Sequence, residues 1–274
     1  MKYSILINTC DKFEDCWEPF FKLWSIYWPN CSGKIYLNTE YKEFSYPGID
    51  ITSVKCGQQL DLPSRTRATW SQCLRQALKV IDTDIVLYMQ EDYFLNRRVQ
   101  NDIVEHFVHL MHQHEHIKCI HLTDQSVTSC GKSPYKKLNI CTPTQRYRVC
   151  CQAALWRKDE LINLLRDDEN AWEFEEYGSW RSSALNHDYY VVDTTWVRQG
   201  EYEIIPYIFT GIVQGRWFRP VTELFATHNI NIDYNRRGFH SAGPQKPLLL
   251  RIKFRIQKFP RILQKRYEVT QMTR

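Results

Sequence analysis

The sequence lacks the patterns that mark several classes of protein. No C-x-x-C pair occurs among its ten cysteines, and their placement gives no disulfide framework. No apolar run approaches the ~18 residues of a membrane span. The N-terminus passes directly into Tyr3-Ser4-Ile5-Leu6-Ile7, which is too short for the core of a signal peptide and has no cleavage site. We therefore expect a cytoplasmic protein whose cysteines are reduced thiols.

Net charge is also small. The chain has 36 Lys and Arg against 31 Asp and Glu, and +5 over 274 residues gives no indication of a nucleic-acid partner. Hydrophobic residues make up 43% and charged residues 24%, which is typical of a globular chain long enough for one sizeable core. Aromatic residues reach 14%, with nine Trp. Such flat rings are common in sugar-binding and nucleotide-binding clefts, and equally in aromatic cores.

One stretch, Asp84 to Leu95, carries the strongest pattern in the chain. It begins with the apolar run Ile85–Met89, which is typical of a strand buried on both faces of a mostly parallel sheet. The run ends at Gln90-Glu91-Asp92. Open α/β sheets bind ligands beyond the carboxyl ends of their strands, where two carboxylates can hold a divalent cation and, through it, a diphosphate. The alternative is an acidic turn that only ends the strand.

Strand and helix patterns alternate around this stretch, and their order predicts a Rossmann-like α/β fold. Further strands are expected at Tyr3–Thr9, Lys34–Asn38, Ile49–Val54, Ile117–Leu122, Tyr147–Trp156, Tyr189–Trp196 and Glu203–Ile208. Helices are expected at Glu14–Trp28, Thr66–Val80, Asn101–His116, Lys158–Arg166, about 167–185, and Val221–Thr227. The polar segment Asp124–Thr144 is expected to be a loop over the cleft.

The C-terminus has a composition of its own. From Pro247 to Arg266, Leu, Ile and Phe alternate with Lys and Arg. A basic, apolar segment of this kind can lie on an anionic membrane surface. The alternative is an ordinary closing helix packed on the domain, and Pro260 interrupts its periodicity. We therefore divide the chain into a single domain, residues 1–246, and a basic C-terminal tail, residues 247–274.

Six short sequence motifs occur between Ile5 and Phe239, and their order and spacing together are unlikely to arise by chance. They are I-L-I-N-T-C-D with the helix around Trp17, Q-E-D-Y-F-L, C-Q-A-A-L-W, W-E-F-E, G-I-V-Q-G-R-W and R-R-G-F. Together they resemble a GT-A-like family of bacterial and viral glycosyltransferases that build cell-surface polysaccharides. The resemblance implies a GT-A-like single domain that takes a nucleotide-sugar as donor substrate and a saccharide as acceptor. The basic tail is consistent with a lipid-linked acceptor and a peripheral place on the inner face of the membrane.

The resemblance assigns the acidic pair a role. In GT-A enzymes the acids after the central strand contact the donor diphosphate, usually through Mg²⁺ or Mn²⁺, which makes Glu91 and Asp92 the donor and metal ligands. A cation there stabilises the charge that develops on the leaving diphosphate. This sequence departs from the common Asp-x-Asp by having Gln90 at its first place, so strict metal dependence stays open.

The same resemblance points to a catalytic base. An inverting transfer needs a group that accepts the proton of the acceptor hydroxyl. By analogy with the acid that opens a late helix in GT-A enzymes, the base is Glu175 or Glu173 in W-E-F-E, and Glu175 is preferred. Near the start of a helix, the dipole favours the ionised form. Acids that only complement the dipole are the alternative.

Further donor contacts are expected around the first strand and the following helix. They are Asn8, Thr9 and Asp11 at the end of the first strand, and Gln58, Asp61 and Arg65 before the helix at 66–80. Arg216, Arg236 and Arg237 could contact phosphates, and His228 could complete a metal site.

Two other functions stay open. A nucleotidyltransferase acting on sugar phosphates has a similar sheet, but it usually has a Gly-rich, basic loop after the first strand, and Asn8-Thr9-Cys10-Asp11-Lys12 lacks that. A non-catalytic sugar-binding protein would bind the same ligands without turnover.

Overall fold

The computed structural model describes residues 2–60, 67–123, 127, 131–197, 203–241 and 248–272, with the backbone alone for 248–255. Its centre is an eight-stranded sheet in the order β3-β2-β1-β4-β7-β5-β8-β6. The strands are β1 (Ser4–Asn8), β2 (Lys34–Asn38), β3 (Ile51–Ser53), β4 (Ile85–Gln90), β5 (Ile117–His121), β6 (Leu138–Ile140), β7 (Ala154–Arg157) and β8 (Asp188–Val192). The pairs β1–β2, β1–β4, β2–β3 and β5–β8 are parallel, whereas β7 and the edge strand β6 are antiparallel to their neighbours. The predicted α/β class with a mostly parallel central sheet is confirmed.

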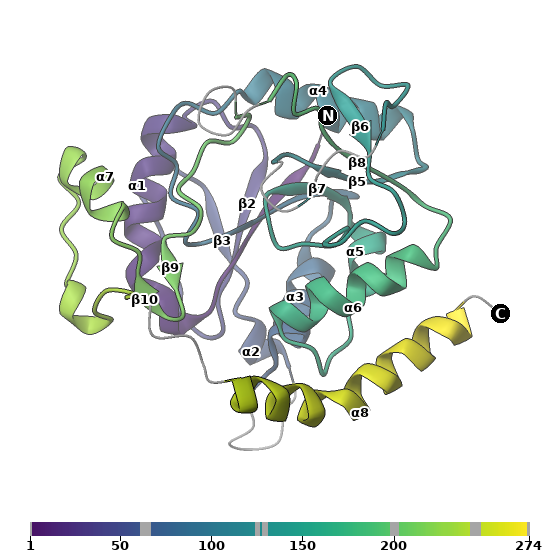
Figure 1. Cartoon of the computed structure of the whole chain (residues 1–274). Coiled ribbons are helices and arrows are strands. Elements are labelled where there is room, and N and C mark those ends of the chain that lie inside the picture. Colours follow the sequence, from purple (N-terminus) through teal and green to yellow (C-terminus); the bar gives the residue numbers. More distant parts are fainter. Residues whose placement is uncertain are drawn as a thin grey trace.

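Helices cover both faces of this sheet, with α1 on one side and α3 and α6 on the other (Figure 1). The helices are α1 (Trp17–Tyr27), α2 (Cys56–Gln59), α3 (Trp70–Val80), α4 (Asn101–Gln113), α5 (Lys158–Leu164), α6 (Ala171–Ser183), α7 (Val221–Thr227) and α8 (Leu248–Met272), with 3-10 turns η1 (Asp11–Cys16) and η2 (Tyr234–Arg236). Because both faces are covered, every residue of β4 from Ile85 to Met89 is buried. The apolar run therefore has the environment that its composition predicts.

Strand order reverses beside β1, and this position determines where a ligand can bind. From β1 the chain proceeds outward to β2 and β3, then returns through α3 to β4 on the other side of β1. The crossovers on the two sides therefore leave a crevice between the carboxyl ends of β1 and β4. Asn8 and Gln90, the last residues of these strands, are directly paired in register.

Three expectations about the later chain are wrong. The expected strand 147–156 is wrong in its first half, because β7 begins only at Ala154 and ends at Arg157. Before it, Tyr147 has a left-handed φ of 58°, and the Arg148 guanidinium donates to the backbone oxygens of Cys141 and His187 instead of extending a strand. The segment 203–208 makes only an isolated bridge, Tyr207 with Leu95, because it passes beside the chain after β4 rather than beside a strand. Instead of a loop over the cleft, residues 138–140 form the edge strand β6, which pairs with β8; residues 124–126 and 128–130 lie outside the described part of the chain.

The segment 211–217, which contains two glycines, forms a small hairpin. Strands β9 (Ile212–Val213) and β10 (Arg216–Trp217) pair antiparallel across two residues, Gln214 and Gly215, with φ of 53° and 77°. Two consecutive positive φ values are the signature of the tight hairpin turn that matches strand twist, which is why a glycine stands here.

The C-terminal helix α8 continues through Pro260 and packs against α6 (Figure 1). Its buried Lys265 contacts the carboxylates of Asp168 at 3.0 Å and Glu169 at 3.1 Å, and Arg181 of α6 binds the same Glu169 at 2.6 Å. Glu169, Lys265 and Arg181 are almost completely buried, so each charge depends on the others for compensation. The described part of α8 is thus fixed to the domain by ion pairs.

We expect Lys265→Met to lower the free energy of unfolding by about 1.5–3 kcal/mol, the usual cost of a lost hydrogen bond to a buried charged group. Arg181 still compensates Glu169 in this variant, which keeps the loss below that of an isolated buried charge. Urea unfolding at neutral pH measures it, with Lys258→Met, on the exposed part of the same helix, as control. Equal stability of both variants would show that the network does not fix α8.

The described residues also bear on two expectations from the sequence, the one about membrane spans and the one about cysteines. None of the helices in those ranges combines the length and apolar character needed to cross a bilayer. The nine cysteines that the structure describes form no disulfide with one another, and most are buried.

Candidate active site

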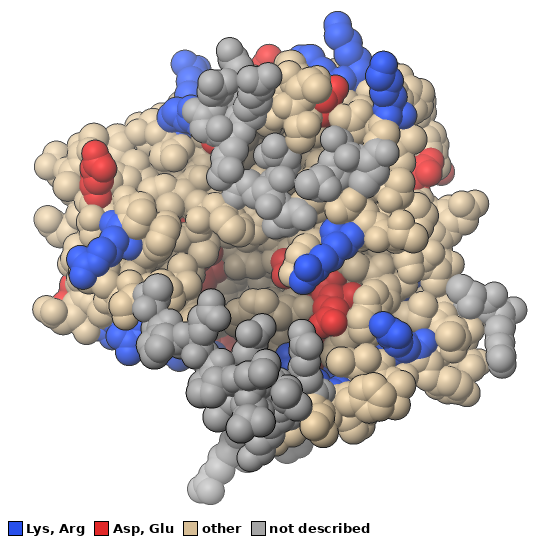
Figure 2. All heavy atoms as spheres, viewed as in Figure 1, with Lys and Arg blue, Asp and Glu red and all other residues tan. Residues whose placement is uncertain are grey.

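A cleft of 860 Å³ lies at the carboxyl ends of β1 and β4. Its walls are the ends of these two strands, the loop after β1, the start of α6 and the segment 209–215. It opens in the middle of the face shown in Figure 2, where acidic side chains border the hollow. The volume is within the usual range for pockets that enclose a small-molecule ligand. The strand-order reversal and the cleft therefore coincide.

Glu91 and Asp92 lie in this cleft, and both side chains are only 7% exposed. One oxygen of Asp92, Oδ2, accepts hydrogen bonds from the Thr210 hydroxyl and, at 3.1 Å, from the backbone N–H of Ile212. These bonds attach the segment 209–212 to the end of β4. Burial raises the pKa of Asp92 against the effect of these bonds, and burial together with the charge of Asp92 raises the pKa of Glu91 well above its ordinary value.

The acidic pair fits a divalent cation. Oδ1 of Asp92 is buried and has no hydrogen-bond partner among the described residues, an arrangement that is costly for a carboxylate unless something binds it. No group of three or more His, Cys, Asp or Glu side chains in the described ranges could hold a metal by itself. Two carboxylates that share the cation with substrate phosphates are the arrangement that Mg²⁺ commonly adopts.

The structure separates the two glutamates proposed as the base. Glu175 lines the cleft, and its Oε1 accepts the backbone N–H of Cys151 at 2.8 Å. Glu173 instead caps α6 by bonding Asn170 and forms an ion pair with Arg261 of α8 at 2.6 Å, on the side away from the cleft. Burial raises the pKa of the Glu175 carboxyl, in opposition to the helix N-terminus, which favours the ionised form.

Of the six expected donor contacts before α3, two line the cleft, two do not, and two lie outside the described residues. Asn8 and Thr9 line it, but their side chains also hold the strand end in place: Asn8 bonds Tyr88 and Asn38, and Thr9 accepts from Trp17 Nε1 at 2.9 Å.

Asp11 and Gln58 bind backbone groups elsewhere in the structure. Both oxygens of Asp11 accept backbone N–H groups of Glu40 and Tyr41, so this acid joins the loop after β1 to the chain after β2. Gln58 donates to the backbone oxygen of Tyr41 at 3.3 Å. Neither lines the cleft. Asp61 and Arg65 lie outside the described residues.

The late basic residues do not line the cleft either. Arg237 binds Asp15 at 2.7 Å, and Arg236 binds Glu14 at 2.9 Å. Arg216 is exposed on β10. The ring of His228 contacts the Tyr27 hydroxyl at 2.7 Å, away from the acidic pair, so it does not complete a metal site. Arg237 still lies near enough to Glu91 and Asp92 to lower the pKa of each.

Several cleft residues were not singled out from the sequence. Lys12 is a cation in the cleft wall, where it can approach an anionic ligand. The rings of Trp70, Tyr147, Trp172 and Phe209 line the same space, and Trp172 is 77% exposed. The only signal in the sequence was the high overall aromatic content, which does not distinguish a cleft ring from a core ring.

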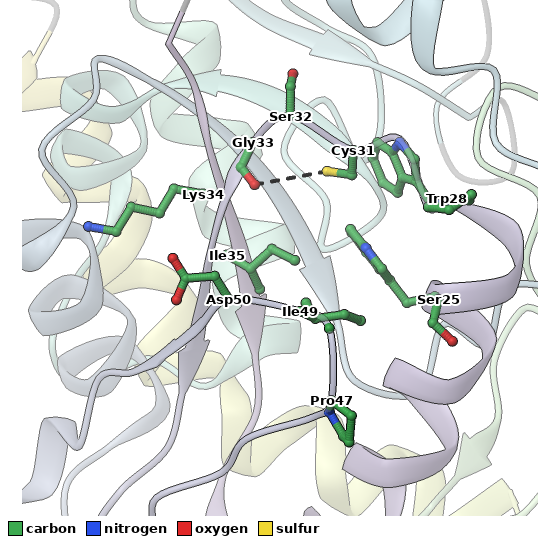
Figure 3. A pocket seen from close by; sticks show the side chains of 13 residues that line it. Ser25, Trp28, Cys31, Ser32, Gly33, Lys34, Ile35, Pro47, Ile49 and Asp50 are labelled. Atoms are coloured by element: carbon green, nitrogen blue, oxygen red, sulfur yellow. Dashed lines mark hydrogen bonds between the residues drawn. The ribbon is translucent and has the colours of Figure 1, made fainter.

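A second hollow of 570 Å³ lies near the amino end of β2. Figure 3 shows it between the end of α1 and the residues around Gly33 and Asp50, with the side chains of Lys34 and Asp50 at one side. The Cys31 thiol there donates a hydrogen bond to the backbone oxygen of Gly33, with 3.9 Å between sulfur and oxygen. This hollow is at the edge of the sheet opposite the acidic pair and contains no comparable cluster of acids.

No family model matches the sequence, and no curated protein does. Among solved structures, TarS 1–349 of S. aureus is 12% identical, with 86% of this chain and 68% of that chain covered and a TM-score of 0.44. Glucosyl-3-phosphoglycerate synthase from Mycobacterium tuberculosis, in complex with Mn²⁺ and UDP-glucose, is 12% identical, with 88% of this chain and 81% of that chain covered and a TM-score of 0.42. The mannosyltransferase PcManGT from Pyrobaculum calidifontis, in complex with GDP-Man and Mn²⁺, is 13% identical, with 73% of this chain and 58% of that chain covered and a TM-score of 0.43. Similarity at this level assigns no chemistry to this chain.

Proposed function

We propose that this chain is a glycosyltransferase that moves a sugar from a nucleotide-sugar to a saccharide acceptor. One observation carries the proposal: a buried acidic pair and a separate half-buried glutamate line the same cleft at the strand-order reversal. A leaving diphosphate needs positive charge opposite it, and an acceptor hydroxyl needs a base. The cleft offers residues for both tasks, with aromatic rings against which a sugar can stack.

In this proposal Glu175 is the base. It takes the proton of the acceptor hydroxyl while that oxygen forms a bond to the anomeric carbon and the bond from this carbon to the donor diphosphate breaks. The backbone N–H of Cys151 fixes one carboxylate oxygen, and the Cys151 thiol also bonds this carboxylate, so Glu175 is held in place at the cleft wall. Partial burial removes part of the hydration of the carboxylate and raises its pKa, which makes it a stronger base.

The donor diphosphate would lie near Glu91, Asp92 and Lys12. A divalent cation, when held by Glu91 and Asp92, supplies the charge that stabilises the leaving diphosphate. Lys12 adds a second positive charge from the loop after β1. Asp92 also fixes the segment 209–212 through Thr210 and Ile212, so the same residue orders one wall of the cleft.

We base the proposed acceptor and place of action on the C-terminal segment. The proposal includes a lipid-linked saccharide as acceptor and a cytoplasmic, peripheral location on the inner face of the membrane. Support comes from the basic composition of α8 and from its contact with α6, whose first residues line the cleft.

The pH profile of transfer should have an acid limb governed by Glu175. Because burial raises its pKa, the ionised base is present above the raised value and is lost as the pH falls through it. The limb in kcat/KM should therefore lie above the ordinary glutamate pKa of 4.5. A profile that stays flat down to that value would exclude Glu175 as the base.

A screen of nucleotide-sugars by thermal shift, with and without Mn²⁺, tests the proposal as a whole. A donor that binds the native state raises the melting temperature, and release of nucleoside diphosphate shows turnover. Release of pyrophosphate from a nucleoside triphosphate and a sugar phosphate would identify a nucleotidyltransferase instead. Binding of sugars without any turnover would identify a sugar-binding protein.

A further inference from the structure

The outer face of α8 carries an apolar stripe. Ile256, Phe259, Leu263 and Tyr267 are 67%, 57%, 52% and 66% exposed. At ~100° per residue these positions fall within roughly 80° of one another around the helix axis. Large apolar side chains that are aligned and exposed in this way usually mark a contact surface rather than chance exposure.

The opposite face of α8 holds the helix in a fixed orientation. Arg261 and Lys265 are turned toward the domain, where they bind Glu173, Asp168 and Glu169. The stripe therefore faces away from the domain. These ion pairs also place α8 next to the start of α6, and the residues there, Asn170 to Trp172, line the cleft.

The charge of α8 indicates what covers the stripe. Residues 248–272 contain seven Lys and Arg against one acid, Glu268, and two of the seven, Arg261 and Lys265, are paired with acids of the domain. The helix therefore keeps a positive net charge, and two copies of it repel each other when they are placed face to face. Four partly exposed side chains also offer far less than the ~800 Å² per partner of a standard protein interface. An anionic surface that accepts apolar side chains satisfies both the charge and the stripe.

We propose that the outer face of α8, formed by Ile256, Phe259, Leu263 and Tyr267, docks on an anionic lipid bilayer and brings the cleft to acceptors anchored there. This inference rests on the proposed function only for the acceptor; the docking itself requires no turnover. The helix lies in the plane of the interface, with the stripe among the upper acyl chains, and the basic composition of the helix favours anionic headgroups around it.

The test is sedimentation of the full chain with vesicles of neutral lipid and of neutral plus anionic lipid. Wild type should bind the anionic vesicles at low salt and be released by high salt, because screening shortens the attraction. Phe259→Ser with Leu263→Ser should weaken binding at least ~10-fold through the lost apolar burial. The matched control, Gln257→Ser with Gln264→Ser, changes two exposed residues beside the stripe on the same helix and should stay within ~3-fold of wild type.

Three results would overturn the proposal. They are a wild-type chain that ignores anionic vesicles at low salt, equal losses in the two double variants, and a wild-type dimer in light scattering that the stripe variant abolishes. Thermal melts of both variants establish that they are folded. Release of nucleoside diphosphate, measured without vesicles, reports separately on the proposed function, so docking and transfer can fail independently.

Discussion

Glu175→Gln is expected to lower the turnover of sugar transfer by ~100- to 10,000-fold, the usual contribution of a positioned general base. Gln has nearly the same shape and can still accept the Cys151 N–H at the position of Oε1, so the wall of the cleft stays in place. It cannot accept the proton of the acceptor hydroxyl. Since the base acts only in the transition state, donor affinity should change little. Single-turnover kinetics and donor titration measure the two quantities separately.

Glu173→Gln is the matched control, because the two acids are two residues apart on α6. Its carboxylate caps the helix and binds Arg261, so its loss costs an ion pair that is partly exposed and should leave turnover within a few-fold of wild type. Small and equal losses in the two variants would place the base elsewhere. A large loss in Glu173→Gln alone would mean that the helix cap, and not Glu175, governs the chemistry.

Asp92→Asn is expected to lower transfer at least ~100-fold in a chain that remains folded. The asparagine oxygen can still accept from Thr210 and Ile212, which preserves the attachment of the segment 209–212. The substitution removes the negative charge with which Asp92 and Glu91 would hold a cation beside the donor diphosphate. The expected loss of transfer is on the scale of removing one preorganised electrostatic group. The shift in melting temperature that Mn²⁺ and donor produce together should shrink in parallel.

Glu14→Gln provides the comparison for Asp92. Glu14 lies on η1 outside the cleft, where it binds Lys42 and Arg236 at the surface. Removing its charge should leave transfer close to wild type. Near-normal activity in a folded Asp92→Asn chain would remove the acidic pair from the site, and equal losses in both variants would indicate a general effect of net charge.

The sequence alone located the central strand and the acids at its end. Ile85–Met89 is apolar at every position, a pattern that a strand buried on both faces requires, and the polar residues that follow must then lie at the edge of the sheet. Helical periodicity also placed most of the helices, from α1 to α7, because an amphipathic stripe is a local property of ten or so residues. The aromatic excess showed that rings are abundant without showing which of them line the cleft.

The tertiary structure decided which polar residue does what. Asp11 and Gln58 stand at plausible positions along the chain, yet their partners are backbone groups after β2 that no local pattern reveals. Glu173 and Glu175 are equivalent in sequence until Arg261 of α8, far along the chain, binds one of them. Arg237 was expected at a phosphate and is held by Asp15. Periodicity determines the face on which a side chain lies, but its hydrogen-bond and ionic partners come from segments that only folding brings together, and those partners decide whether a charge is free for chemistry.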